Sequence, residues 1–132
     1  MASPPKPVLV VDDDWDILEA MHDTLAVEGY DTVDVGDGQR ALDYLRSHPP
    51  PGLVLLDWNM PRMNAQQFMA ALARDPLPET PPIVLLTADA KIAEKGAGYA
   101  GYLKKPVELD KLFETVRRYC GPGSRERSRY PD

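Results

Sequence analysis

Three aspartates could carry much of the chemistry that this sequence supports. Asp12 and Asp13 directly follow an apolar run at residues 8–11, and Asp57 directly follows another at residues 53–56. Carboxylates that lie close together repel one another unless protons or a cation offset their charge. Their hard oxygen atoms suit Mg²⁺, which keeps several of its own waters when it binds to protein. If the two runs converge, the sequence predicts an acidic cation site.

A carboxylate at such a site can also act as a nucleophile toward phosphorus. A metal ion and a lysine would then neutralise charge on the oxygens of the transferred phosphoryl group. The chain offers Thr87, which directly follows a β-rich run at residues 83–86, and Lys105, which lies just after another at residues 99–103. The hydroxyl could donate a hydrogen bond to the phosphoryl group and the lysine could supply the positive charge.

The elements that must position these residues alternate along the chain. Short β-rich runs occupy residues 8–11, 32–35, 53–56, 83–86 and 99–103. Helical spacing of apolar residues predicts a helix from near Asp14 to Gly29, further helices after Gly38 and Asn64, and a last one with a face of Leu109, Leu112, Phe113 and Val116. Asp14 is expected to cap the first helix.

Strands that alternate with amphipathic helices predict a doubly wound α/β fold. Right-handed crossovers carry each helix over the sheet, so the strands are parallel and covered on both faces. In such sheets, ligands bind beyond the carboxyl ends of the strands. The aspartates, Thr87 and Lys105 should therefore meet at one edge of the sheet.

Length and composition limit the alternatives. The chain has 132 residues, 43% of them hydrophobic and 27% charged, which suits one globular domain. Apolar runs such as residues 53–56 fall far short of the roughly 20 residues that span a membrane, so we expect no membrane insertion and a cytoplasmic location. The formal charge of −6 argues against direct binding of nucleic acid. Cys120, the single cysteine, is expected in a buried helix position.

Four short motifs follow the predicted strands, each after its own strand. They are Val10-Val11-Asp12-Asp13-Asp14, Asp57-Trp58-Asn59-Met60-Pro61-Arg62-Met63, Thr87-Ala88 and Lys105-Pro106. In this order they resemble the motifs of one family, the receiver domains of bacterial two-component response regulators. The resemblance covers residues 7–120 and implies a flavodoxin-like three-layer sandwich, (βα)5, with strand order 2-1-3-4-5. Residues 1–6 would then be a disordered extension and 121–132 a flexible tail.

The resemblance also implies a role for each residue of the site. Asp57 would accept a phosphoryl group from a histidine kinase or phosphotransfer protein. Asp13 would bind Mg²⁺ (or Mn²⁺) directly, Asp12 would bind it through water, and the backbone carbonyl of Asn59 would add a ligand. Lys105 would contact the phosphoryl oxygens. The chain would act as a signalling switch or phosphorelay intermediate toward an unknown downstream protein, and as an enzyme only in its own phosphotransfer and dephosphorylation.

The resemblance further implies a conformational switch. Thr87 would move to hydrogen-bond the phosphoryl group, Tyr102 would turn inward with it, and Pro106 would follow a cis peptide bond. Two features depart from the family pattern. Ala65 stands where the family usually has glycine, and the segment from Thr87 to Lys105 is about four residues short, roughly one helical turn, which predicts a shortened fourth helix.

Two other functions remain open from sequence. One is a receiver-like interaction module that never accepts phosphate, which the intact site residues argue against. The other is a phosphatase with an aspartate nucleophile, which would lie after the first strand. Residues 12–16 lack the D-x-D-x-[TV] pattern of such phosphatases, so this alternative is the more distant one.

Overall fold

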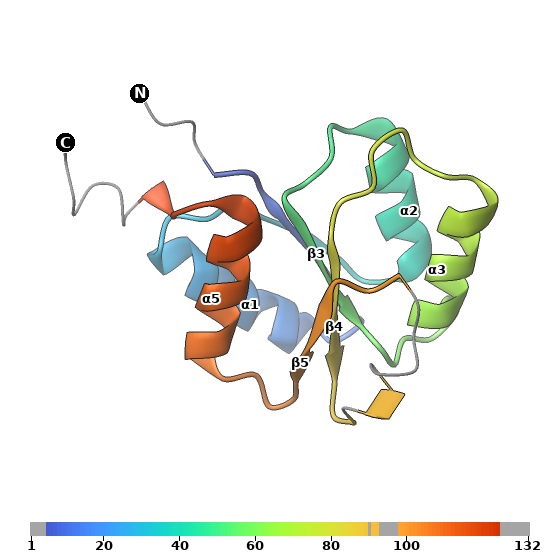
Figure 1. Ribbon diagram of the computed structural model, residues 1–132. Coiled ribbons are helices and arrows are strands. Elements are labelled where there is room, and N and C mark those ends of the chain that lie inside the picture. Colours follow the sequence, from blue (N-terminus) through green and yellow to red (C-terminus); the bar gives the residue numbers. More distant parts are fainter. Residues whose placement is uncertain (1–4, 90, 93–97, 125–132) are drawn as a thin grey trace.

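A single parallel sheet forms the centre of the molecule (Figure 1). The computed structural model describes residues 5–89, 91–92 and 98–124. The strand order is β2-β1-β3-β4-β5, and each neighbouring pair is parallel, which confirms the predicted order and topology. The strands are β1 (Val8–Val11), β2 (Thr32–Val35), β3 (Leu53–Asp57), β4 (Ile83–Thr87) and β5 (Gly101–Lys104).

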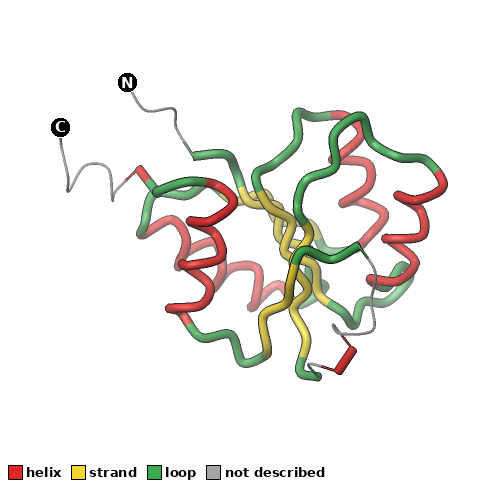
Figure 2. Tube along the Cα trace, in the orientation of Figure 1, coloured by secondary structure: helices red, strands yellow, loops and turns green. Residues whose placement is uncertain are grey.

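Helices cover both faces of this sheet. In Figures 1 and 2, α1 and α5 lie on one face and α2 and α3 on the other, so the fold is a three-layer sandwich. The expected short fourth helix falls on a segment whose residues 90 and 93–97 lie outside the described part of the chain. The helices in the described part with eight or more residues are α1 (Trp15–Val27), α2 (Gly38–Ser47), α3 (Ala65–Arg74) and α5 (Leu109–Cys120).

The central strands are apolar throughout because both of their faces are covered. Every residue of β1, β3 and β4 is buried, whereas the edge strands β2 and β5 are only partly so. Alternate residues serve opposite faces: Val8 and Val10 pack with α1 and α5, and Leu9 and Val11 pack with α2 and α3. Phe68 of α3, fully buried, is among the largest side chains of the second core.

Capping residues determine where the helices begin. The carboxylate of Asp14 accepts a hydrogen bond from the backbone N–H of Asp16, which confirms its predicted capping role. Asn64 and Gln67 exchange side-chain and backbone hydrogen bonds in a capping box at the start of α3. Ala65 then opens α3 as a buried helical residue, so the position does not need the conformational freedom of glycine.

The predicted bounds of the last strand were wrong. The strand begins at Gly101 rather than at residue 99, and Tyr99 precedes it with its side chain packed against the core of the α2 and α3 face. Leu109 does lie on the predicted apolar face of the last helix, beside Leu112 in a surface groove, yet it is 56% exposed. It is the first residue of α5, and Leu112 and Val116 supply the buried part of that face.

The chain beyond α5 folds back onto the turn between α1 and β2. The hydroxyl of Tyr30 donates a hydrogen bond to the carbonyl oxygen of Gly121 at 2.6 Å. The hydroxyl of Ser124 donates one to the carbonyl oxygen of Gly29 at 3.1 Å. Gly123 lies so close to Glu28 that a Cβ atom would collide with its carbonyl oxygen. This contact joins the ends of α1 and α5 at the amino edge of the sheet. Across the described residues, no helix has the length and apolar character to cross a membrane.

Candidate functional site

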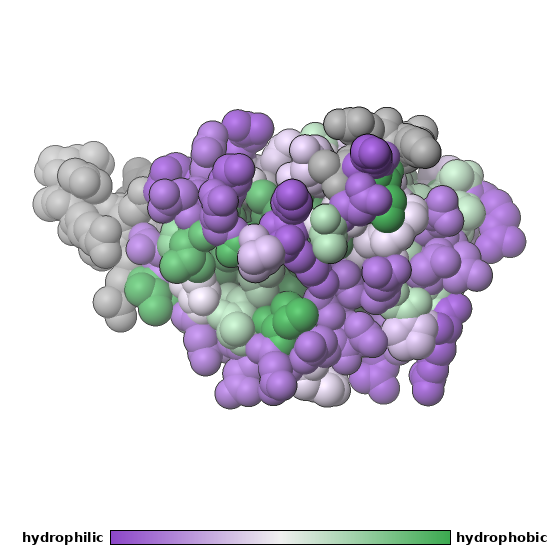
Figure 3. All heavy atoms as spheres, turned by 90° about the horizontal axis from the view of Figure 1, so that it is seen from below, coloured by the Kyte–Doolittle hydropathy of each residue, from purple (hydrophilic) through white to green (hydrophobic). Residues whose placement is uncertain are grey.

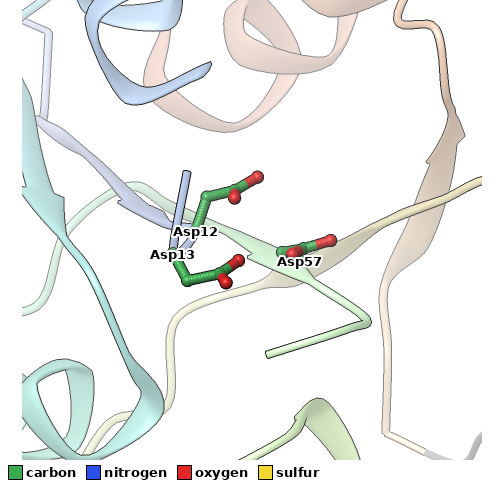
Figure 4. A group of neighbouring side chains, drawn as sticks. All are labelled: Asp12, Asp13 and Asp57. Carbon is green, nitrogen blue, oxygen red and sulfur yellow. The ribbon is translucent and has the colours of Figure 1, made fainter. Parts of the chain in front are cut away.

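The carboxyl edge of the sheet brings the predicted site residues together. Asp12 and Asp13 follow β1, Asp57 ends β3, Thr87 ends β4, and Lys105 follows β5. Figure 4 shows the three aspartate side chains projecting from the ends of β1 and β3 into the same space. The parallel register explains this, because Val11 pairs with Leu56 and therefore places the residues after both at the same height.

The three aspartates form a compact group, here called the acid group. One carboxylate oxygen from each of Asp12, Asp13 and Asp57 lies within 4.8 Å of the others. Asp12 is 1% exposed and Asp57 is 5% exposed, whereas Asp13 faces solvent. The group therefore combines two buried carboxylates with one accessible carboxylate, which leaves a route for a cation from solvent.

Lys105 is the cation that the described structure places against this group. Its Nζ donates a hydrogen bond to Asp57 Oδ1 at 2.8 Å and lies 3.5 Å from Asp12 Oδ2. Partial burial acts to lower the pKa of the Lys105 ammonium, but the hydrogen bond and charge of Asp57, together with the nearby carboxylate of Asp12, outweigh it and raise that pKa above its usual value. Lys105 thus stays protonated and offsets one of the three negative charges. The bond from Lys105 to Pro106 is cis, as the resemblance implied.

Asp12 is the most deeply buried carboxylate of the group. Its Oδ1 accepts a hydrogen bond from the backbone N–H of Asp14 at 2.9 Å, while its buried Oδ2 has no hydrogen-bond partner among the described residues. Burial raises the pKa of Asp12 most; the Asp14 N–H works in the opposite direction, and the charge of Asp57 raises the pKa further. A buried carboxylate oxygen that receives no hydrogen bond, lies beside two other carboxylates and has one ammonium group at 3.5 Å is a suitable ligand for a hard divalent cation.

The predicted switch residues lie at the rim of the site. Thr87 is 3% exposed, and its hydroxyl exchanges hydrogen bonds with the backbone of Asp89, whose N–H donates at 3.1 Å. Tyr102, on β5, is 43% exposed. Asn59 is exposed in the loop after β3, next to the half-buried Trp58. In this structure the Thr87 hydroxyl is thus engaged with the Asp89 backbone, and the Tyr102 side chain is partly exposed.

Sequence reasoning missed residues on the other side of Asp13. Trp15, Arg40 and Arg62 line a hollow that shares the Asp13 carboxylate with the acid group. Surface tryptophan and arginine residues occur in most proteins, and these three are far apart in sequence, so no local pattern marks them. Arg62 alone carried a signal, since it lies inside the run from Asp57 to Met63 that the family resemblance uses.

Comparisons with known proteins agree with this geometry. The family model for the response regulator receiver domain matches residues 8–117 of this chain. The polar-differentiation response regulator DivK of Brucella anthropi is 28% identical over 121 residues, which cover 89% of this chain and 98% of DivK. The phosphate regulon transcriptional regulatory protein PhoB of Pseudomonas aeruginosa is 34% identical over 128 residues, covering 92% of this chain and 56% of PhoB.

Solved structures give the same answer for the fold. The chemotaxis response regulator CheY4 of Vibrio cholerae superposes with a TM-score of 0.76 at 28% identity, over 87% of this chain and 98% of that one. This chain belongs to the receiver-domain family of two-component response regulators. Receiver domains are signalling modules rather than conventional enzymes, and the acid group of this chain fits the magnesium binding and phosphorylation of that family.

Proposed function

We propose that the chain is a phosphorylation-dependent switch or phosphorelay intermediate, with Asp57 as the phosphoryl acceptor. The donor would be a histidine kinase or a phosphotransfer protein. The observation that supports this best is the 2.8 Å hydrogen bond from Lys105 to Asp57 inside a group of three carboxylates. It places a nucleophile and the positive charge that a phosphoryl group needs at one point of the sheet edge.

A divalent cation, Mg²⁺ or Mn²⁺, would complete the site. The carboxylates of Asp12, Asp13 and Asp57 and the backbone carbonyl of Asn59 would hold it. When bound, the ion supplies positive charge to the phosphoryl oxygens. The buried Oδ2 of Asp12 supports this assignment. No described residue gives it a hydrogen bond, and the Lys105 ammonium 3.5 Å away carries one positive charge beside three carboxylates, so a cation would supply charge that the group lacks.

The transfer itself needs little from the protein beyond position and charge. A carboxylate oxygen of Asp57 forms a new bond to phosphorus, the bond from phosphorus to the donor nitrogen breaks, and its electron pair stays on the donor imidazole. Lys105 then turns its hydrogen bond from the acceptor carboxylate to the phosphoryl oxygens. Because Lys105 already contacts Asp57, this exchange requires only a short displacement of the ammonium group.

The switch would follow from the new charge at Asp57. The hydroxyl of Thr87 exchanges its contacts with the Asp89 backbone for a hydrogen bond to a phosphoryl oxygen. This movement vacates space beside β4, and Tyr102, which is partly exposed on the neighbouring β5, turns into it. A downstream protein would distinguish the two positions of this ring.

An apolar groove beside Lys105 suits the approach of a donor helix. The groove has a volume of about 330 Å³ and lies between α1 and α5, where Figure 3 shows hydrophobic side chains gathered. Ile17, Met21, Leu109 and Leu112 contribute to it, and Lys105 closes one side. A helix seated there would hold its phosphohistidine next to Asp57, because Lys105 contacts both the groove and the acceptor.

Intrinsic fluorescence tests the proposal, since Trp58 adjoins Asp57 and Trp15 lies close to Asp13. Titration with Mg²⁺ should change the emission, and beryllofluoride should then produce a further change that Asp57→Asn abolishes. Asp43→Asn, an exposed aspartate on α2, should respond like the unmodified protein. Failure of beryllofluoride to give any response in the presence of Mg²⁺ would instead support the phosphate-independent interaction module.

A further inference from the structure

A separate hollow of about 250 Å³ opens beside the acid group. It lies between the start of α1, the loop before α2 and the loop after β3. Two arginines, Arg40 and Arg62, line it with Trp15, and so do two aspartates, Asp13 and Asp37. Asp13 belongs to both the hollow and the acid group, so a molecule that reacts at Asp57 can reach the hollow with a short chain of atoms.

The guanidinium N–H groups of the two arginines can donate hydrogen bonds to a ligand. Arg62 has a backbone φ of 67°, a left-handed conformation that residues other than glycine rarely adopt, and its side chain forms no hydrogen bond or ion pair with any residue that the structure describes. Arg40 lies 3.8 Å from the Asp37 carboxylate and is 67% exposed, so this pair is loose. Neither guanidinium is committed to holding the fold together.

The two acidic residues of the hollow, Asp13 and Asp37, have other roles that reduce their repulsion of an anion. Asp37 caps α2 by accepting a hydrogen bond from the backbone N–H of Arg40 at 2.8 Å. Asp13 would be neutralised by the divalent cation. The indole of Trp15 is 64% exposed and offers a flat apolar wall beside the two guanidinium groups. With the cation bound, the hollow therefore suits a small anionic group attached to a short hydrocarbon chain.

We propose that the hollow is a subsite for the leaving group of a small-molecule phosphoryl donor, namely an acyl phosphate whose acyl chain ends in a second carboxylate. The inference rests on phosphoryl transfer to Asp57 as proposed above. An Asp57 oxygen bonds to phosphorus, the bond from phosphorus to the acyl oxygen breaks, and its electron pair leaves with the dicarboxylate. Arg40 and Arg62 bind the distal carboxylate, and Trp15 covers the chain.

A matched pair of donors tests the subsite. Succinyl phosphate carries the distal carboxylate, and butanoyl phosphate has the same chain length without it. With saturating Mg²⁺ and limiting donor, we expect succinyl phosphate to modify the protein about three- to tenfold faster, as expected for one or two partly exposed charge pairs. This ratio should fall toward one in about 0.5 M salt, where such pairs are screened.

Variants locate the effect. The double variant Arg40→Gln, Arg62→Gln should bring the ratio close to one, and lysine at both positions should retain part of it. Arg46→Gln, at the far end of α2 and paired with Asp75, should keep the full ratio. Equal rates for the two donors in the unmodified protein, or a ratio that persists in the double variant, would overturn the subsite. If acetyl phosphate also fails to modify the protein, phosphoryl transfer to Asp57 fails with it.

Discussion

Replacement of Asp12 by asparagine should stabilise the protein when no divalent cation is present. Asp12 is 1% exposed and has carboxylates of Asp13 and Asp57 within 4.8 Å, against one ammonium group at 3.5 Å. At an effective dielectric constant of about 20, each carboxylate repels Asp12 by about 3.5 kcal/mol and Lys105 attracts it by about 4.7 kcal/mol. Because water screens the exposed Asp13 further, we expect Asp12→Asn to raise the free energy of unfolding by about 1–2 kcal/mol at pH 7.

The effect should depend on pH with a definite sign. Burial, together with the charge of Asp57, raises the pKa of Asp12 above its ordinary value of 3.8. The folded protein therefore keeps this proton to a higher pH than the unfolded chain does, and the contribution of Asp12 to stability falls as pH rises through that interval. Below pH 3.8, where Asp12 is protonated in both states, the advantage of Asp12→Asn should disappear.

Urea unfolding at pH 7 and at low pH, with and without Mg²⁺, measures these terms. The unmodified protein should gain about 1.4 kcal/mol when Mg²⁺ is present at ten times its dissociation constant, and Asp12→Asn should gain less. Asp14→Asn is the matched control, because asparagine caps a helix as well as aspartate does. A less stable Asp12→Asn protein at pH 7 without Mg²⁺ would refute the electrostatic reasoning.

Four further outcomes test the packing. Gly52→Ala should cost about 1–3 kcal/mol in urea unfolding, because its Cβ would lie 2.7 Å from the Cys120 Sγ, and Cys120→Ala should restore part of the loss. Burial raises the pKa of the Cys120 thiol to about 11, so iodoacetamide at pH 8 should modify it only after unfolding, as mass spectrometry would show. Phe68→Ala should lower the free energy of unfolding by about 3–5 kcal/mol, because it leaves a cavity in the core between the sheet and α2 and α3. A smaller loss would show that this core can close around the cavity. Asn64→Ala should lose about 1 kcal/mol through the capping box of α3, whereas Asn64→Asp should keep most of it.

The fold followed from the sequence because its signals are periodic and local. The apolar run ending at Leu56 leads directly to Asp57, and Asp14 caps α1 where the pattern begins. The last strand was harder to predict, since an edge strand of four residues with Gly101 and an exposed Tyr102 lacks a continuous apolar run. Leu109 shows a related limit of the prediction. Helical spacing identifies the apolar face of a helix, but it does not tell which residues of that face are buried.

The site was predictable to the extent that strand ends determine it. Asp12, Asp57 and Lys105 converge because parallel strands end together, and the order of the motifs identified them. The spacing could not predict that Asp12 keeps a buried oxygen without a hydrogen bond or that Arg62 adopts a left-handed conformation. Both depend on contacts between segments that are distant in sequence, and no local pattern records such contacts.

Because the chain folds back after α5, the two ends of the α1 and α5 helix pair differ. At the amino edge, hydrogen bonds from Tyr30 and Ser124 fasten the end of α1 to the end of α5. At the other edge, the first turns of the same helices, at Trp15 and Leu109, are exposed. The two helices are therefore tied together at the end that lies away from Lys105, and the end where a donor helix would bind is exposed.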